Sequence, residues 1–348
     1  MQGLIVSLFF FARTSLAWSC DGHMVVAQLA LSSGIMSATT LQKAKGLVDF
    51  LNAQYPRTGA TFQEVACWAD DIRSSEGFGN WHFIDIPVCR LANPSKCTPP
   101  PPDNNAVWAV EESEETLTNS SATLDKARML RFAIHIIGDI HQPLHAASYF
   151  STQFPTGDLG GNKWQIGGVP FASELHALWD EGLGLFYQQL RRPLNTTGFD
   201  WVGSLADRVL GLHPVASLQP QIAEKNVTQW ALESHAIAED FVYSAPQKPT
   251  PIPAEYLQGG QDIVLKQLAI AGYRLADTLC VGGLLPSRAG GCCARFAIFP
   301  HTLLPLPVLS SPKPAESFFS LNPKKQYTLG CLRQQSDKCI VFFIVCFC

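Results

Sequence analysis

Apolar residues recur at helical spacing along most of the chain. Val65, Trp68 and Ile72, for example, lie three and four positions apart, which places them on one face of a helix. This pattern, together with longer apolar stretches, predicts helices over residues 22–31, 61–73, 106–118, 122–142, 172–190, 201–211, 219–245 and 254–280. The segments follow one another without an internal repeat. We therefore expect a mainly α fold in a single domain over residues 18–280.

Only short stretches of this region have a β-like or irregular pattern. Residues 81–85 are predicted to be extended, up to Pro87, and residues 94–103 form a Pro-rich loop. Residues 155–170 are rich in Gly and Pro, and we expect a loop or a short hairpin there, between two helices. The expected β structure is therefore limited to a minor hairpin.

The first seventeen residues have the pattern of a secretory signal peptide. The run from Leu4 to Ala12 is apolar, and residues 15–17 (Ser-Leu-Ala) place small residues where a signal peptidase requires them. No Lys or Arg precedes the run, but the run is too short to span a membrane. The prediction is cleavage between Ala17 and Trp18 and secretion to an extracellular, secretory or vacuolar compartment.

The last part of the chain, residues 281–348, differs in character from the rest. It contains Gly-Gly and Cys-Cys pairs and several prolines, without sustained periodicity. Its final ten residues are apolar but cover only about half a membrane span. Two interpretations stay open. The segment is either a sorting or anchoring segment, or a tail that is disordered or results from a mistaken gene model read through non-coding sequence. No function is assigned to it.

The overall composition restricts the class of ligand. The 348 residues are 47% hydrophobic, which suffices for a sizeable core. The formal net charge of −4 argues against a general binder of duplex DNA, which would carry a broad basic face. Phosphate substrates remain compatible with this charge, because bound cations can supply the positive charge locally.

Two further features agree with export. Three Asn-X-Ser/Thr triplets are candidate glycosylation sites, at Asn119, Asn195 and Asn226. Eleven cysteines suit an oxidising compartment. Spacing does not determine how they pair, but two candidate disulfides are Cys89 with Cys97, around a short loop, and Cys20 with Cys67.

Candidate metal ligands are concentrated in one short segment. His135 and Asp139 are four residues apart, so they project from the same face of the predicted helix. A proline then ends the helix, which lets His145 turn back toward that face. The four-residue spacing recurs in His176 and Asp180. Imidazole and carboxylate ligands in this number indicate more than one divalent metal ion, with zinc favoured.

The motifs around these residues resemble those of a known family. They are Trp-Ala-Asp (68–70), Trp-His-Phe-Ile-Asp (81–85), His-x-x-Gly-Asp-x-x-Gln-Pro-Leu-His (135–145) and Leu-His-x-x-Trp-Asp (175–180). In this order they resemble the secreted zinc-dependent class I nucleases, which include fungal and plant single-strand-specific nucleases and protist 3′-nucleotidase/nucleases. The resemblance extends over residues 18–280 and implies the helical phospholipase C/nuclease fold.

The resemblance also implies a site for three zinc ions, held by nine ligands. Asp70, His82, His135 and Asp139 would hold the first ion, and His145, His176 and Asp180 the second. Trp18, through its α-amino nitrogen and carbonyl oxygen, would join His23 and Asp139 around the third. An α-amino group exists at Trp18 only after the preceding peptide bond is cut. Signal cleavage would therefore create a metal ligand.

The family's reaction is hydrolysis of single-stranded RNA and DNA. By resemblance, a hydroxide that bridges two zinc ions attacks phosphorus in line, and 5′-phosphate products result; 3′-nucleotidase activity is implied as well. Catalytic roles fall to Asp70, Arg73 and Asn162, the last two also as phosphate contacts. Phe83 would stack a base and Asp85 would hydrogen-bond its edge.

The substrates expected are single-stranded RNA and DNA and 3′-nucleotides. We expect no stable binding of duplex DNA, no obligate protein partner and a monomeric protein. Two alternatives stay open: a zinc-dependent phospholipase C, which shares the fold, and a zinc-binding secreted protein without catalysis. His141 lies outside the nine matched positions, so it is expected to support the site rather than to bind metal.

Overall fold

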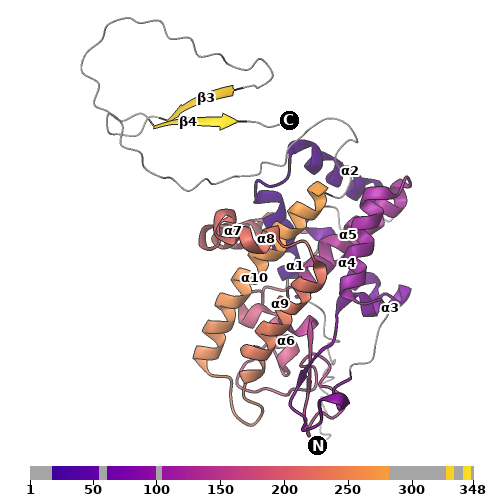
Figure 1. The fold of residues 1–348 in the computed structure, drawn as a ribbon, viewed down its shortest axis with the longest axis vertical. Helices are drawn as coiled ribbons and strands as arrows, with labels where there is room; N and C mark the ends of the chain where they lie inside the picture. The colour runs from indigo at the N-terminus through magenta and orange to yellow at the C-terminus, as the bar shows by residue number, and fades with distance from the viewer. Residues whose placement is uncertain (1–17, 55–60, 99–103, 282–326, 333–339, 346–348) are drawn as a thin grey trace, which may run out of the picture. The chain divides into compact units, whose positions relative to one another are not determined.

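The computed structural model describes residues 18–54, 61–98, 104–281, 327–332 and 340–345 (Figure 1). The predicted signal peptide, residues 1–17, lies outside the described residues. The chain divides into two units, residues 1–287 and 288–348. In the second unit the described residues form two antiparallel strands, β3 (Tyr327–Leu332) and β4 (Ile340–Val345). The interpretation of residues 281–348 as a tail stays a prediction.

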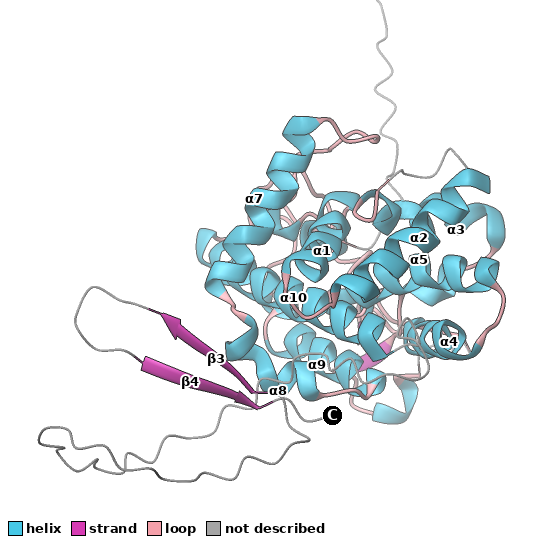
Figure 2. Ribbon diagram, turned by 90° about the horizontal axis from the view of Figure 1, so that it is seen from above, coloured by secondary structure: helices cyan, strands magenta, loops and turns pink. Residues whose placement is uncertain are grey.

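Helices make up most of the first unit, as predicted (Figure 2). Their bounds are α1 Cys20–Ser32, α2 Ala38–Gln54, α3 Trp68–Glu76, α4 Ala106–Asn119, α5 Thr123–Asp139, α6 Leu175–Asp180, α7 Thr196–Leu212, α8 Gln219–Ala223, α9 Val227–Asp240 and α10 Ala254–Val281. Within the described residues, no helix is both long enough and apolar enough to cross a membrane.

Helix α5 lies in the core and packs against α1, α2, α3, α4 and α10. Every residue from Leu130 to Asp139 is buried, and most of them are apolar. The polar residues of this stretch are His135, Asp139 and Arg131, and Nη2 of Arg131 donates a hydrogen bond of 2.7 Å to the side chain of Asn52 on α2. Burial of the whole C-terminal half places His135 and Asp139 out of contact with solvent.

The β structure of the first unit is minor, as predicted, but it is not a hairpin. Strand β1 (Ile86–Cys89) pairs with β2 (Ala147–Phe150) in parallel, with Ile86 opposite Ala147. Parallel strands need a long connection, so this pair joins segments far apart in the sequence. The segment expected to be a loop or short hairpin, residues 155–170, is a loop whose end makes two isolated bridges, Gln165 with Glu174 (antiparallel) and Gly167 with Pro251 (parallel).

Two predicted helices are shorter than expected. The helix predicted over 172–190 ends at Asp180, because Gly182, Leu183 and Gly184 all adopt positive φ (56°, 53° and 96°). The helix predicted over 219–245 is divided into α8 and α9. The side chain of Asn226 caps α9, accepting a hydrogen bond from the backbone N–H of Gln229 (3.4 Å).

Helix α2 is absent from the predicted elements. Its buried positions, Thr40, Ala44, Val48 and Leu51, do have helical spacing, but two of the four side chains are small or polar. The remaining positions include several polar residues, so the apolar stripe is narrow. Packing of α2 against α5, which cannot be seen in the local pattern, stabilises it.

Both candidate disulfides are present in the structure. Cys20 on α1 is bonded to Cys67, which precedes α3, with a Cα–Cα distance of 5.2 Å. Cys89 at the end of β1 is bonded to Cys97, with a Cα–Cα distance of 5.9 Å. The three asparagines of the candidate glycosylation triplets, Asn119, Asn195 and Asn226, are all exposed.

Candidate metal centre

Six structural elements bring the predicted histidine and aspartate ligands together. His23 comes from α1 and Asp70 from α3, while α5 supplies His135 and Asp139 one turn apart. The other four come from short segments: His82 from the 3₁₀ turn Gly79–His82, His145 from the 3₁₀ turn Pro143–His145, and His176 and Asp180 from α6. All eight side chains are nearly or fully buried, with at most 8% of any one exposed.

Asp139 lies at the centre of the first cluster of ligands. Its Oδ2 is 3.0 Å from Nδ1 of His82 and 3.4 Å from Nε2 of His135, and its Oδ1 is 3.1 Å from Nε2 of His23. Asp70 approaches from the other side, with Oδ1 3.7 Å from the same nitrogens of His82 and His135. One carboxylate therefore faces two different sets of imidazoles, as a ligand shared between two ions must.

The second cluster is formed by His145, His176 and Asp180. The Nε2 atoms of the two histidines are 3.1 Å apart. Asp180 places Oδ1 3.9 Å from Nε2 of His145 and Oδ2 3.5 Å from Nε2 of His176. The ligand atoms of this cluster all lie within 4.8 Å of one another. The same holds for two overlapping groups in the first cluster. One group is His23, Asp70 and His135, and the other is His82, His135 and Asp139.

Hydrogen bonds fix which nitrogen of three histidines carries the proton. Nδ1 of His135 donates to the carbonyl of Ala66 (2.5 Å), Nδ1 of His145 to that of His82 (2.6 Å), and Nδ1 of His176 to that of Gly160 (2.5 Å). A backbone carbonyl only accepts, so in the neutral imidazoles the lone pair is on Nε2. The lone pairs of His145 and His176 therefore face each other, an arrangement that a cation between them would stabilise.

Several buried polar atoms in the first cluster have no hydrogen-bond partner within the described residues. They are Oδ1 of Asp70, Oδ1 of Asp139, Nε2 of His82 and both ring nitrogens of His23. Buried polar atoms without partners are costly and rare in proteins. Three of these atoms face the cluster: Oδ1 of Asp139 is 3.1 Å from Nε2 of His23, and Oδ1 of Asp70 is 3.7 Å from ring nitrogens of His82 and His135. Buried oxygen and nitrogen atoms gathered in this way fit a bound divalent metal.

The protonation states also suit metal binding. Burial lowers the pKa of His176 to about 4 and that of His145 well below its ordinary value, so both rings are neutral at pH 7. Burial alone would raise the pKa of Asp139, but His135, His23 and His82 outweigh it and hold the pKa well below its usual range. Neutral imidazoles around ionised carboxylates are the form in which these side chains bind metal.

Trp18 lies next to His23 and α5, and its role as a ligand stays a prediction. Its side chain is fully buried. A Cβ at Gly138 would lie 2.7 Å from Nδ1 of His23 and 3.8 Å from Cδ1 of Trp18, so the glycine before Asp139 permits this close packing. The N–H of Ser19 donates to the carbonyl of Asp180 (2.8 Å). The beginning of the domain is thus tied to a ligand of the second cluster.

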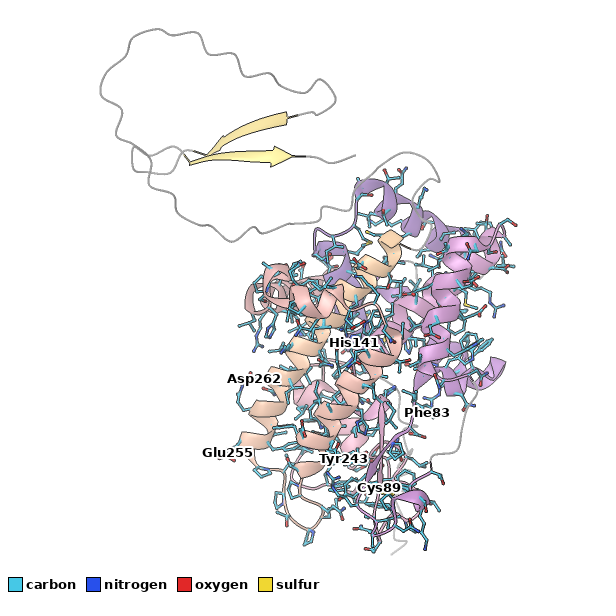
Figure 3. All side chains as sticks on the ribbon, viewed as in Figure 1. Phe83, Cys89, His141, Tyr243, Glu255 and Asp262 are labelled. Atoms are coloured by element: carbon cyan, nitrogen blue, oxygen red, sulfur yellow. A yellow bond between two sulfur atoms is a disulfide. The ribbon has the colours of Figure 1, made fainter. Side chains whose placement is uncertain are left out.

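The predicted substrate-contacting residues are half-buried, and their contact with substrate stays a prediction. Arg73, half-buried at the end of α3, is close enough to His176 for its charge to contribute, after burial, to the low pKa of that ring. Asn162 donates through Nδ2 to the carbonyl of Leu159 (2.7 Å). Phe83 directly follows His82 and is half-buried (Figure 3). Asp85 is half-buried too, and burial, followed by the charge of Asp158, raises its pKa to about 6.

His141 is separate from the ligands, as expected. Its Nδ1 donates to the carbonyl of Ile137 (2.7 Å), and its Nε2 accepts from Arg274 on α10 (2.9 Å). Both ring nitrogens are therefore occupied within the protein. Burial, reinforced by the charge of Arg274, lowers its pKa to about 3.

Two residues of the site were missed from sequence. Gln142 is fully buried; it donates through Nε2 to Oδ1 of Asp180 (2.7 Å) and accepts at Oε1 from the N–H of Leu144 (2.6 Å), so it orients a predicted ligand. Leu159 is 50% exposed and has a φ of 58°, in the loop that holds Asn162. The signal for Gln142 was its position inside the motif; a lone leucine carries no comparable signal.

Comparisons with known proteins converge on one family. Residues 18–281 match the family model described as S1/P1 Nuclease. The chain is 24% identical to Nuclease P1 of Penicillium citrinum over 280 residues, which are 75% of this chain and 96% of that protein. It is likewise 24% identical to Nuclease PA3 of a Penicillium species, with the same coverage. It is 25% identical to Endonuclease 3 of Arabidopsis thaliana over 305 residues, 79% of this chain and 92% of that one.

Proposed function

The chain belongs to the S1/P1 nuclease family and is a hydrolase with endonuclease activity, and we propose that it is a secreted, zinc-dependent enzyme that cleaves single-stranded RNA and DNA. The proposal includes 5′-phosphate products, 3′-nucleotidase activity, three zinc ions per chain and a monomeric state. The observation that carries it is the convergence of eight imidazole and carboxylate side chains, nearly all buried, in three groups whose ligand atoms lie within 4.8 Å of one another.

The donor set is the reason for choosing zinc. Imidazole nitrogens and carboxylate oxygens, without thiolates, are typical of catalytic zinc sites. Bound zinc lowers the pKa of water to near neutrality and neutralises charge on a phosphoryl group. Ligation would follow the sets implied by the family: Asp70, His82, His135 and Asp139; His145, His176 and Asp180; and Trp18, His23 and Asp139.

The remaining residues of the site would bind and orient the substrate. Arg73 can hold two phosphate oxygens through its planar guanidinium, and the amide of Asn162 can donate to a third. Phe83 and Leu159 expose apolar surface beside the ligands, and a base needs an exposed face to stack on such surface. A paired base in a duplex presents no such face, which accounts for the single-strand preference.

Export and glycosylation complete the proposal. Two disulfides within the described residues suit an oxidising compartment. All three candidate glycosylation asparagines are exposed, and Asn195 caps α7 through Oδ1, which leaves its Nδ2 available for a glycan. We propose cleavage between Ala17 and Trp18 as the event that exports the protein and frees the α-amino group.

The proposed function is tested with the purified mature protein and two substrates. We expect hydrolysis of single-stranded RNA, loss of activity with a zinc chelator and recovery on adding zinc. Turnover of phosphatidylcholine alone would instead establish a phospholipase. Bound zinc without hydrolysis of either phosphoester would leave a non-catalytic zinc protein.

The ionisation of Asp85 predicts a pH dependence of substrate binding. Because its pKa is about 6, Asp85 is a carboxylate above that pH and accepts hydrogen bonds from base N–H groups; below it, the protonated acid loses this capacity. The KM for single-stranded RNA should therefore rise as pH falls from about 7 to about 5. One hydrogen bond to a charged group is worth about 1.5 kcal/mol, so the rise should be about tenfold.

The control for this prediction is a pair of aspartate variants. Asp85→Asn should show a high KM that no longer changes over this range, whereas Asp207→Asn, an exposed residue on α7, should behave as the wild type. If the KM of Asp85→Asn still rose between about pH 7 and about pH 5 as it does in the wild type, the role assigned to this carboxylate would be excluded.

A further inference from the structure

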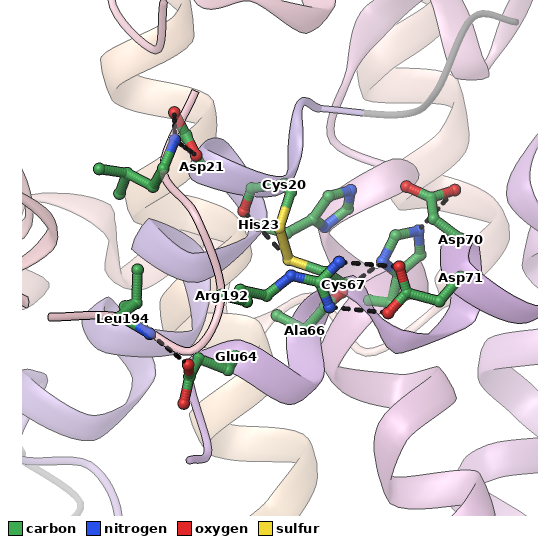
Figure 4. Close-up of a disulfide and its surroundings, with 12 residues drawn as sticks. Cys20, Asp21, His23, Glu64, Ala66, Cys67, Asp70, Asp71, Arg192 and Leu194 are labelled. Carbon is green, nitrogen blue, oxygen red and sulfur yellow. Dashed lines mark hydrogen bonds and ion pairs between the residues drawn. A yellow bond between two sulfur atoms is a disulfide. The ribbon is translucent and has the colours of Figure 1, made fainter. Parts of the chain in front are cut away.

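Residues 186–194, here called the strap, follow α6 and lead into α7. The strap contributes none of the nine predicted ligands. Nevertheless, it forms hydrogen bonds to three segments that carry predicted ligands or residues hydrogen-bonded to them. The partners of the strap in these segments are Asp21, Asp71 and Glu64 (Figure 4). This arrangement suggests that the strap serves the metal centre from outside it.

The strap begins at Phe186, which packs against the start of the domain. The Phe186 ring is fully buried and meets the Trp18 ring edge to face, with centroids 5.7 Å apart. A Cβ at Gly22 would lie 2.9 Å from this ring, and one at Gly182 would lie 2.6 Å from it. Glycine at both positions is what lets Phe186 cover Trp18 and the first turn of α1.

Farther along, alternate residues of the strap bind three acidic side chains. The N–H of Leu190 donates to the carboxylate of Asp21 (3.2 and 3.4 Å), and the N–H of Leu194 donates to Glu64 (2.7 Å). Between them, Arg192 forms a two-point ion pair with Asp71, with both N–O distances 2.7 Å. Paired hydrogen bonds of this kind fix orientation as well as distance.

Each of these acids is within two residues of a ligand of the first cluster or of a residue that supports one. Asp21 is two residues before His23 on α1, and Asp71 directly follows Asp70 on α3. Glu64 is two residues before Ala66, whose carbonyl accepts the Nδ1 proton of His135. The Cys20–Cys67 disulfide joins the same segments to one another (Figure 4). None of the three segments carries His145, His176 or Asp180.

We propose that the strap is a positioning element for the first cluster, in which the Arg192–Asp71 pair sets the place of Asp70 relative to His23 and His135. This inference rests on the proposed zinc site. It assigns to Arg192 an effect on metal affinity at one cluster and none at the other, which a general contribution to folding would not produce.

The test compares zinc binding by Arg192→Met, Asp71→Asn and the wild type, with free zinc buffered over a range of concentrations. Changes to groups that support metal ligands weaken metal binding by about 10- to 100-fold, and we expect about tenfold here. The loss should affect the ions of the first cluster, while one ion per chain binds as in the wild type. Arg192→Lys, which retains the charge without the two-point geometry, should fall between.

A control is available in Arg90, a more exposed arginine that forms an ion pair of 2.8 Å with Glu239. Arg90→Met should bind zinc as the wild type does. Equal zinc affinities in Arg192→Met, Asp71→Asn and Arg90→Met would overturn the inference, and so would an equal weakening of all the ions.

A second measurement separates this inference from the proposed function. In metal-free protein, Arg192→Met should exchange the amide hydrogens of residues 20–24 and 69–73 about tenfold faster than Arg90→Met does, because the strap no longer holds these segments. This result does not depend on hydrolysis of RNA. Equal exchange rates in the two variants at these residues would refute the role of the strap, even if the protein is a zinc-dependent nuclease. A wild-type protein that binds no zinc would refute the proposed cofactor but not the effect of the strap on these segments.

Discussion

Replacing Asp139 with Asn is expected to lower the hydrolysis of single-stranded RNA by on the order of a thousandfold. Asp139 faces the imidazoles of the first cluster with both of its oxygens, which lie within 3.4 Å of ring nitrogens of His23, His82 and His135. Asparagine has the same shape but no charge and a single acceptor oxygen, so it cannot serve two cations. Metal ions contribute several kcal/mol to such reactions, and each 1.4 kcal/mol is about a tenfold change in rate.

Activity is measured together with zinc content, and the loss of both is the expected result. The control is Asp262→Asn, an exposed aspartate on α10 that lies outside the nine ligands (Figure 3). It should keep wild-type activity and zinc. An Asp139→Asn enzyme that retained about three zinc ions and near-normal turnover would contradict the shared-ligand role and, with it, the proposed trinuclear site.

The sequence was most informative where local spacing and chemistry coincide. The four-residue spacing of His135 and Asp139 implied a common helix face, and both lie on the buried half of α5. The same holds for His176 and Asp180 on α6. That His23, Asp70 and His82 join them came from the order of motifs in a family, because no local pattern encodes which helices meet.

The parts that escaped prediction depend on contacts between distant segments. The pairing of β1 with β2 links two four-residue strands whose local pattern predicts neither a partner nor a direction. The end of α6 at Asp180 is set by the tight packing of Gly182 against Phe186. In the motif Gln142 is one polar residue among several, and only the fold brings its amide into a hydrogen bond with Asp180. Tertiary contacts decide each of these outcomes.

A form of the protein that keeps Ala17 before Trp18 is expected to lose one zinc ion and most of its activity. In this form the nitrogen of Trp18 is part of a peptide bond, whose lone pair is delocalised and unavailable to a metal. Native mass spectrometry should find about two zinc ions where the mature form binds about three.

Trp18→Phe separates the amine from the indole ring. This variant begins at the same residue and keeps the α-amino group, so it should retain the third zinc ion even if packing against Phe186 weakens. If the Ala17 form loses zinc and Trp18→Phe does not, the ligand is the amine, and activation depends on where the signal peptide is cut. If the Ala17 form instead keeps three zinc ions and full activity, His23 and Asp139 hold the third ion without the terminus, and cleavage serves export alone.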